Sequence, residues 1–252
     1  MTVLLALDTS TEYCSVALLS SDDASGASYV APPLVWSRHD KTGAVSSARV
    51  LPAVRELFDE AGIALVECSA VAFGAGPGSF TGLRTATGVA QGLAFGLGVP
   101  VVPVSTLLVC AQSARMRDAA ASRVLAVMDA RMDEVYWADF AWDPEQEEWR
   151  TLRPPALAAP AALAMPSVPF TLAGNAAAAF GQRLAIAAAA RVVDHDAVPH
   201  AVPLAHAALR AYRAGRTVPP EQAAPAYVRD KVAQTTAERL AARGVHEGEP
   251  AR

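Results

Sequence analysis

The chain has 252 residues, of which 52% are hydrophobic and 18% are charged, and its formal net charge is −4. That length allows one or two compact domains with a sizeable core. The mildly acidic balance argues against a protein that binds nucleic acid over a broad surface, although it leaves open an RNA reached through a partner. Cys14, Cys68 and Cys110 are odd in number and form no C-x-x-C pair, which favours reduced thiols over a disulfide framework or a zinc site.

The chain begins with a segment that predicts a strand. Its first residues, MTVLLALD, lack the basic region of a signal peptide, and Asp8 ends a short apolar run. The segment Thr2–Asp8 is apolar almost throughout, as in a strand buried on both faces, and Tyr13–Ser20 is expected to be its hairpin partner. No stretch approaches the ~20 apolar residues of a membrane span. We therefore expect a soluble, cytoplasmic protein with no membrane segment.

The rest of the first half predicts alternating strands and helices. The expected elements, in order, are a strand near Leu34–Ser37, an amphipathic helix over 46–62, a buried strand at Ala70–Phe73, a helix from about Thr81 to Phe95 and a strand over 99–105. The glycine-rich stretch GAGPGSFTGLR, from Gly74 to Arg84, joins the buried strand to the second helix.

The second half begins in a similar way to the first. RVLAVMDARMDEVYWADF (123–140) predicts a strand, a turn opening with Asp129, and a second strand, and so indicates a weak internal repeat. The alanine- and proline-rich stretch 153–170 is interpreted as a variable loop region, 176–190 as helical and 203–215 as the last helix.

These patterns divide the chain into two lobes. We expect an N-terminal lobe over 1–105, joined by part of the C-terminal segment 205–235, and a smaller, more variable lobe over 106–204. The tail 238–252 has little apolar content and is expected to be disordered.

The glycine-rich stretch does not match the standard phosphate-binding patterns. Ser79 and Thr81 stand where G-x-G-x-x-G would need a glycine, and Gly82 is followed by Leu83 rather than by the lysine of a P-loop. The nearest candidates for a degenerate phosphate site are Ser79 here and Asp8, Thr9 and Thr11 at the first turn, with Asp129 in the matching place of the second half. The structural alternatives are glycines needed for close packing and Asx turns at the two aspartates.

The helix behind this stretch carries glycine every four residues, at Gly88, Gly92 and Gly96. Each costs about 1 kcal/mol of helix stability relative to alanine, so three on one face need a reason. A ridge of small residues lets another helix approach closely. The helix that packs on this ridge is either a neighbour in the same chain, near Leu51–Phe58, or part of another protein; the sequence does not decide between these two.

Catalytic residues are scarce. His195, His200 and His206 have no metal-binding helical spacing, and His39 is expected to be solvated in a polar loop. No Ser/His/Asp or Cys/His arrangement stands out.

Four segments together resemble one family. LLALDTSTEYCSVALL, AFGAGPGSFTGLRTATGVAQGLAFGLGVPVVPVSTL, VLAVMDARMDEVYWADF and PAYVRD are similar to the TsaB family (formerly YeaZ) of bacterial tRNA threonylcarbamoyladenosine biosynthesis proteins. The likeness covers the N-terminal half almost continuously, the second hairpin and the stretch Pro225–Asp230.

The resemblance implies an α/β fold of the ASKHA (actin-like ATPase, ribonuclease H-like) type, with two related lobes of mixed β-sheets flanked by helices. It implies a non-catalytic subunit that docks to TsaD, the paralogue that uses ATP and a histidine-bound metal to transfer threonylcarbamoyl to adenosine beside the tRNA anticodon. TsaE completes the assembly, tRNA is met only through the complex, and the chain alone is expected to form a homodimer. By position, the implied interface comprises Phe80, Thr81, Arg84, Thr85, Gly88, Gly92 and Phe95.

The sequence departs from the paralogue at the sites of chemistry. The expected first helix begins VSSARVLP, without the histidine pair that holds the paralogue's metal, and Asp8-Thr9-Ser10 lacks the glycine of an ASKHA D-x-G loop. We therefore expect no catalytic residue, metal or cofactor on this chain. The alternative is an enzyme acting on its own, either an ASKHA nucleotide hydrolase or an M22-like peptidase.

Overall fold

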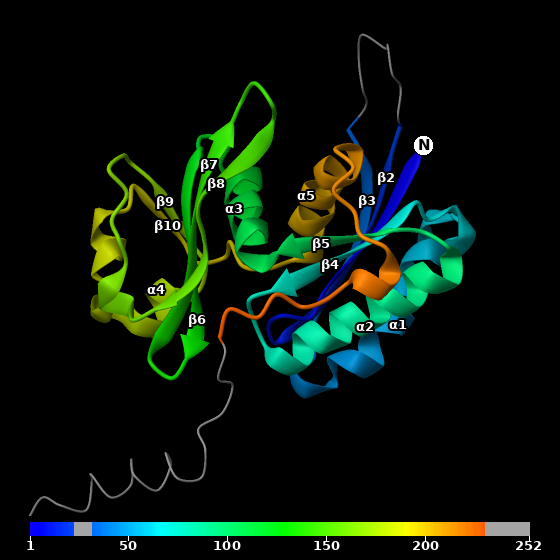
Figure 1. The fold of residues 1–252 in the computed structure, drawn as a ribbon, viewed down its shortest axis with the longest axis horizontal. Helices are drawn as coiled ribbons and strands as arrows, with labels where there is room; N and C mark the ends of the chain where they lie inside the picture. Colours follow the sequence, from blue (N-terminus) through cyan, green and yellow to red (C-terminus); the bar gives the residue numbers. More distant parts are fainter. Residues whose placement is uncertain (23–31, 230–252) are drawn as a thin grey trace, which may run out of the picture.

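The computed structural model describes residues 1–22 and 32–229, which form two lobes, each built on a five-stranded sheet (Figure 1). The first sheet has the order β3-β2-β1-β4-β5 and comprises β1 (Thr2–Asp8), β2 (Tyr13–Ser21), β3 (Leu34–Lys41), β4 (Ala70–Gly76) and β5 (Val101–Ser105). The second has the order β10-β9-β6-β7-β8 and comprises β6 (Arg123–Arg131), β7 (Glu134–Asp143), β8 (Glu148–Ala158), β9 (Thr171–Ala173) and β10 (Val192–Asp194). The expected tail at 238–252 lies outside the described residues.

The two sheets repeat one topology. In each, the first three strands form an antiparallel meander, and the fourth and fifth strands add in parallel beside the first. Numbered within its own half, each sheet therefore has the order 3-2-1-4-5. The internal repeat predicted from the two strand–Asp–turn–strand segments is confirmed at the level of the whole sheet.

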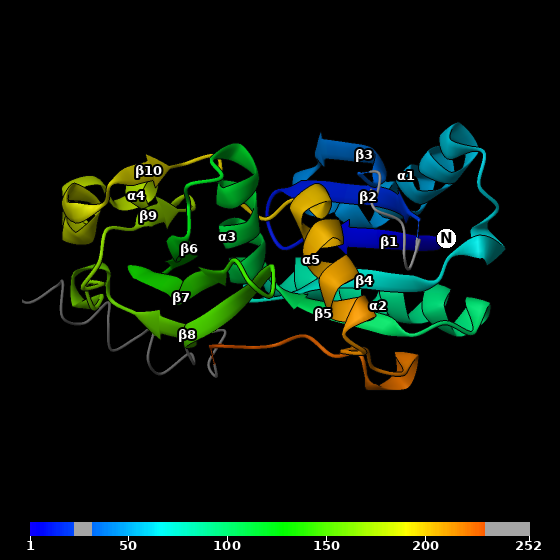
Figure 2. The ribbon, with the colours of Figure 1, turned by 90° about the horizontal axis from the view of Figure 1, so that it is seen from above.

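Helices cover both faces of the first sheet, as the two views show (Figures 1 and 2). The helices α1 (Ser46–Ala61) and α2 (Phe80–Leu97) pack against one face, and α5 (Ala201–Arg213) packs against the other. Side chains of β1 alternate between them: Leu5 and Leu7 join the core under α1 and α2, whereas Leu4 and Ala6 join the core under α5. All seven residues of β1 are buried, which explains its nearly continuous apolar sequence.

The second lobe is joined to the first through α3 (Thr106–Arg117). This helix packs on α5 of the first lobe and on β6 of the second. On the far side of the second sheet, Leu125, Val127 and Leu172 pack beneath α4 (Ala176–Phe180) and the turns that follow it. Among the described residues, no helix combines the length and the apolar character needed to cross a membrane.

Two predictions in the second half are wrong. The stretch 153–170 was expected to be a loop, but β8 continues through Pro154 and Pro155 to Ala158, because β8 is an edge strand where missing N–H donors are tolerated. The stretch 176–190 was expected to be one helix, but α4 ends at Phe180 and short 3-10 turns follow. Gly181 interrupts it with a φ of +52°.

Candidate functional site

A cleft of about 1000 Å³ lies between the lobes. Its walls are the β1–β2 turn, the glycine-rich loop, the β6–β7 turn and segments around Asn175 and His195–Pro199. Thr9, Thr11 and Ser79 line the cleft, so the structure brings three of the four candidates for a phosphate site together there. Asp8 lies beneath them, 1% exposed.

Both turn aspartates make Asx turns. Asp8 accepts hydrogen bonds through Oδ1 from the backbone N–H of Ser10 at 3.0 Å and from the Ser10 hydroxyl at 2.8 Å. In the same way, Asp129 Oδ1 accepts from the N–H of Arg131 at 2.8 Å. The Asx turn, which was the structural alternative to a phosphate site at these aspartates, is thus present in both halves. Asp8 Oδ2 is buried without a hydrogen-bond partner, and burial raises the pKa of Asp8 to about 6.

The glycines of the loop allow backbones to approach closely. A Cβ at Gly74 would stand 2.1 Å from Asp8 Oδ2, one at Gly78 would stand 2.7 Å from the Ser10 carbonyl oxygen, and one at Gly82 would stand 1.8 Å from the Thr9 carbonyl oxygen. At Gly78 and Gly82 no larger residue fits without moving the backbone of the β1–β2 turn, whereas at Gly74 the obstructing atoms belong to the Asp8 and Thr106 side chains. The glycines therefore let the loop and the start of α2 pack directly against the backbone of that turn.

The hydroxyls that could bind an anion take part in hydrogen bonds of these turns, but only Thr9 uses its O–H as the donor. Thr9 Oγ1 donates to the Gly82 carbonyl at 2.6 Å, Ser79 Oγ accepts from the Gly82 N–H at 3.4 Å, and Thr11 Oγ1 accepts from the Tyr13 N–H at 3.3 Å. The one arginine among the cleft residues, Arg131, pairs with Asp129 at 3.3 Å. Ser79 and Thr11 accept through their oxygens, so their O–H groups can still donate to an anion in the cleft.

A column of three rings stands beside the cleft. Tyr13 stacks on His39 with ring centroids 4.4 Å apart, and His39 stands 4.2 Å from His200. His200 Nδ1 accepts from the Val202 N–H at 3.0 Å and so caps α5. Burial lowers the pKa of His39, and burial together with His39 lowers that of His200 to about 4, so both rings are neutral at neutral pH. His39 was expected to be solvated in a polar loop; it is exposed, but it lies near the end of β3 and contacts two rings.

The outer face of α2 is open. Built Cβ atoms at Gly88, Gly92 and Gly96 meet nothing within 4 Å, and the Phe95 side chain is 79% exposed. The alanines of the neighbouring row face the sheet instead. The glycine ridge therefore does not pack against α1 or another described element, which removes the intramolecular explanation. Thr81 and Arg84 are exposed, and Thr85 is half-buried.

The first turns of α2 hold a cluster with the C-terminal segment. The Arg84 guanidinium lies 4.0 Å over the Phe80 ring, and its Nε donates to the Tyr227 hydroxyl at 3.1 Å. The Phe80 and Tyr227 rings lie 5.2 Å apart. Two residues of the implied interface, Phe80 and Arg84, are thus oriented by Tyr227. The sequence held no local signal for this contact, because it joins positions more than 140 residues apart.

The segment 217–229, which we call the strap, crosses from the first lobe to the second (orange in Figures 1 and 2). Near the start of the strap, Val218 pairs with Val101 of β5. At its end, the Arg229 side chain is 11% exposed. It bonds to Glu134 Oε2 at 2.7 Å and to the Arg131 carbonyl at 3.3 Å. Arg131, Met132 and Asp133 have left-handed φ values of 64°, 55° and 57°. Arg229 therefore supports a strained β6–β7 turn.

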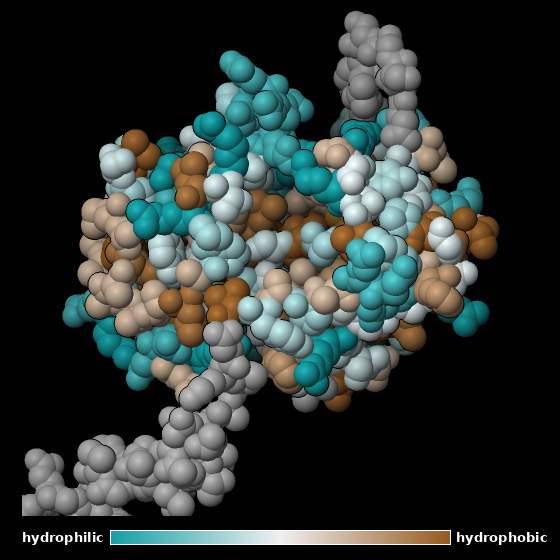
Figure 3. All heavy atoms as spheres, viewed as in Figure 1, coloured by the Kyte–Doolittle hydropathy of each residue, from teal (hydrophilic) through white to brown (hydrophobic). Residues whose placement is uncertain are grey.

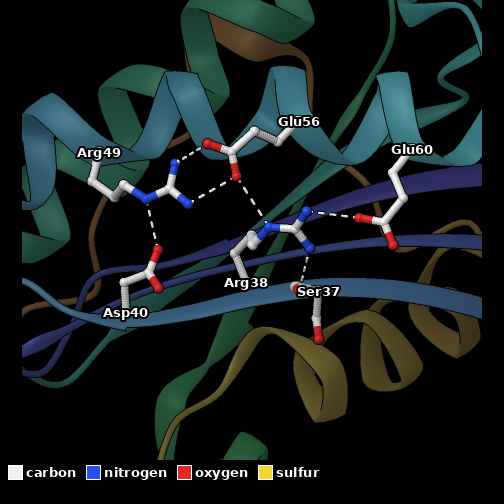
Figure 4. A network of polar contacts seen from close by, with 6 residues as sticks. All are labelled: Ser37, Arg38, Asp40, Arg49, Glu56 and Glu60. Carbon is white, nitrogen blue, oxygen red and sulfur yellow. Dashed lines mark hydrogen bonds and ion pairs between the residues drawn. The ribbon is translucent and has the colours of Figure 1, made fainter.

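Ion pairs fix α1 on β3 (Figure 4). Arg49 bonds to Asp40 of β3 at 2.6 Å and also pairs with Glu56 of α1, while Arg38 of β3 pairs with Glu56 at 3.0 Å and Glu60 at 2.7 Å. The hydrogen bond from Arg49 is the main reason that the pKa of Glu56 falls to about 2. These acidic groups of α1 are thereby engaged on the side of the helix that faces β3.

The described residues contain no group of three or more His, Cys, Asp or Glu side chains placed to hold a metal ion. The three cysteines are free and buried, as the sequence predicted. On the face shown in Figure 3, hydrophobic side chains appear in small groups between hydrophilic ones.

The duplicated 3-2-1-4-5 sheets, with a cleft between them, define a two-lobed α/β protein of the actin-like ATPase (ASKHA) type. The family model described as "TsaD: tRNA N6-adenosine threonylcarbamoyltransferase" matches residues 41–242. The structure is similar to YeaZ from Pseudomonas aeruginosa, with a TM-score of 0.79 and 41% identity over 90% of this chain and 100% of that one. The chain therefore belongs to the TsaD family and stands with its TsaB/YeaZ members.

Curated relatives agree with this assignment over part of their length. The "tRNA threonylcarbamoyladenosine biosynthesis protein TsaB" of Escherichia coli (strain K12) is 44% identical over 140 residues, which is 56% of this chain and 55% of the relative. The protein of the same name from Haemophilus influenzae is 46% identical over 135 residues, or 54% and 52%. The matched segment spans about half the length of these curated relatives.

Proposed function

We propose that this chain is a non-catalytic subunit of the machinery that makes threonylcarbamoyladenosine beside the tRNA anticodon, and that it docks to TsaD and supports it. The names of the TsaB relatives support the pathway. The open glycine ridge of α2 is the observation that carries the docking role, because it is a helix face built for close contact and covered by nothing in the described chain.

The composition of α2 strengthens this reading. Its 18 residues include a single charged side chain, Arg84, although one face of the helix is open to solvent. A solvent-facing helix surface normally carries several charges. Three exposed glycines also cost about 3 kcal/mol of helix stability relative to alanine. A face that is small, nearly uncharged and ends in an exposed Phe95 suits a helical protein partner better than water.

ATP and the metal ion belong to TsaD in this proposal, TsaE completes the assembly, and tRNA is met through the complex, all in the cytoplasm. The arginine of the cleft pairs with Asp129 and Thr9 donates its hydroxyl to Gly82, which favours this proposal over the alternative of a nucleotide hydrolase or peptidase. When TsaD is absent, a second copy of this chain covers the same ridge.

The proposal is tested by placing bulky, charged side chains on the ridge. Gly88→Arg combined with Gly92→Arg should abolish calorimetric binding to purified TsaD and threonylcarbamoyl transfer by the reconstituted complex, while the circular dichroism stays unchanged, because both positions face open space. The matched control is Ala188→Arg combined with Ala189→Arg, which adds the same charges at exposed positions of the second lobe and should bind normally. Unchanged TsaD affinity of the ridge variant would show that the docking surface is elsewhere. Micromolar Mg-ATP binding by the isolated chain would favour the enzyme instead.

A further inference from the structure

The single cation on the open face of α2 is held in a fixed orientation. One face of the Arg84 guanidinium lies on the Phe80 ring and its Nε is bonded to the Tyr227 hydroxyl, so two groups restrain a side chain that is nevertheless exposed. No carboxylate of the described residues forms an ion pair with Arg84, in contrast to Arg38, Arg49 and Arg229. The remaining N–H groups of a pre-oriented guanidinium suit a planar, bidentate acceptor.

We propose that Arg84 is the polar anchor of the docking surface and receives a carboxylate from the protein that packs on α2. This inference rests on the proposed function and names the chemistry of the partner at one point of the surface. The apolar remainder, the glycine ridge and the exposed Phe95, provides contact area, whereas the anchor fixes the register in which the partner helix lies. Arginines that are restrained before binding lose less entropy on pairing and are common among the residues that dominate interface energies.

A protein carboxylate fits this surface better than an RNA phosphate. RNA-binding surfaces gather several cations along the backbone of the nucleic acid, because each phosphate contact contributes separately to the affinity. Here α2 offers one arginine beside glycines, threonines and a phenylalanine, and the whole chain carries a net charge of −4. One cation at the edge of an apolar strip matches a helix with one acidic residue beside a small or apolar face.

The strap makes the anchor depend on the second lobe. Tyr227, which orients Arg84, stands two residues before Arg229, which is fixed to Glu134 and to the β6–β7 turn. On the side of the first lobe, the backbone N–H of Ala226 donates to the carbonyl of Ala75 in β4 at 2.7 Å. Tyr227 is therefore a positioning residue whose hydroxyl is placed from both lobes.

The experiment measures the affinity of the full chain for TsaD from the same organism at about 50 and about 300 mM salt, a range over which exposed ion pairs are progressively screened. Arg84→Ala should weaken binding about tenfold or more at low salt and remove most of the salt dependence. Arg84→Lys should keep the salt dependence with a smaller loss, because the charge stays and the bidentate fork is lost. Tyr227→Phe should weaken binding a few-fold and keep the salt slope, a combination that a general loss of folding would not give.

The control is Arg153→Ala, which removes an equally exposed arginine that lies over the Trp137 ring in the second lobe; it should leave the affinity unchanged. If the ridge variant fails to bind and Arg84→Ala binds as the wild type does, the anchor is refuted and the proposed function stands. If wild-type chain does not bind TsaD, both fall. A loss confined to tRNA binding by the assembled complex, or to self-association, would also overturn the proposal, because it would assign Arg84 to RNA or to a second copy.

Discussion

Replacing the ridge glycines by alanine should separate the stability of the chain from its binding to TsaD. In Gly88→Ala combined with Gly92→Ala, each new methyl group projects into open space, because a built Cβ meets nothing within 4 Å at either position. No clash therefore offsets the gain in helix propensity, about 1 kcal/mol for each glycine removed from a helix interior. The pair should raise the free energy of unfolding by about 2 kcal/mol, which corresponds to a rise in Tm of about 4–8 °C for a chain of this length.

The same two methyl groups should weaken binding to TsaD, because they stand where the partner helix would come closest and so hold the two helix axes apart. Differential scanning calorimetry at low protein concentration and titration calorimetry with TsaD provide the two measurements. Gly96→Ala, one turn further along the same face, should stabilise the helix in the same way. Its effect on the affinity for TsaD shows how far along α2 the contact extends. An unchanged affinity would refute the close approach at the ridge. A lower Tm of the double variant would refute the exposure of the ridge in the isolated protein.

Two further predictions concern buried groups. Because the pKa of Asp8 is about 6 in the folded chain and 3.8 in its unperturbed state, folding holds the proton more tightly; the free energy of unfolding should fall by up to about 3 kcal/mol as the pH rises from about 4 to 6. Asp8→Asn should remove most of this fall and raise the Tm at pH 7 in thermal denaturation, and an undiminished fall in the variant would refute the assignment. His200→Ala should lower the free energy of unfolding in urea by about 1 kcal/mol through loss of the cap on Val202, whereas His200→Asn, which can still accept that bond, should lose less. Equal losses in the two variants would show that the ring stack, and not the cap, is what His200 contributes.

The patterns that predicted the fold correctly were local and strongly periodic. The continuous apolar run of β1 and the Asp turns of both halves give similar structures in similar surroundings, so the repeat in the sequence became a repeated sheet. The spacing of Gly88, Gly92 and Gly96 identified the ridge, but only the three-dimensional arrangement shows that no element of the described chain covers it.

Other features were hidden because they depend on distant residues. Pro154 and Pro155 suggested a loop, and only the order of strands shows that β8 is an edge where prolines fit. The position of His39 between Tyr13 and His200 joins three remote parts of the chain. The stretch Pro225–Asp230 stood out only through a family resemblance, because its described residues, 225–229, form no helix or strand with a periodicity to detect.

The strap also determines when the first lobe becomes complete during translation. The edge strand β5 is covered at Val101 by Val218, which is synthesised 117 residues later. Until then, a nascent chain carries β5 with its backbone groups open to pairing with another polypeptide. The proline in β5, VVPVS, matters most in that interval, since Pro103 removes one N–H from the open edge. Val218 thus covers, at Val101, an edge that the ribosome leaves exposed for nearly half of the chain's synthesis.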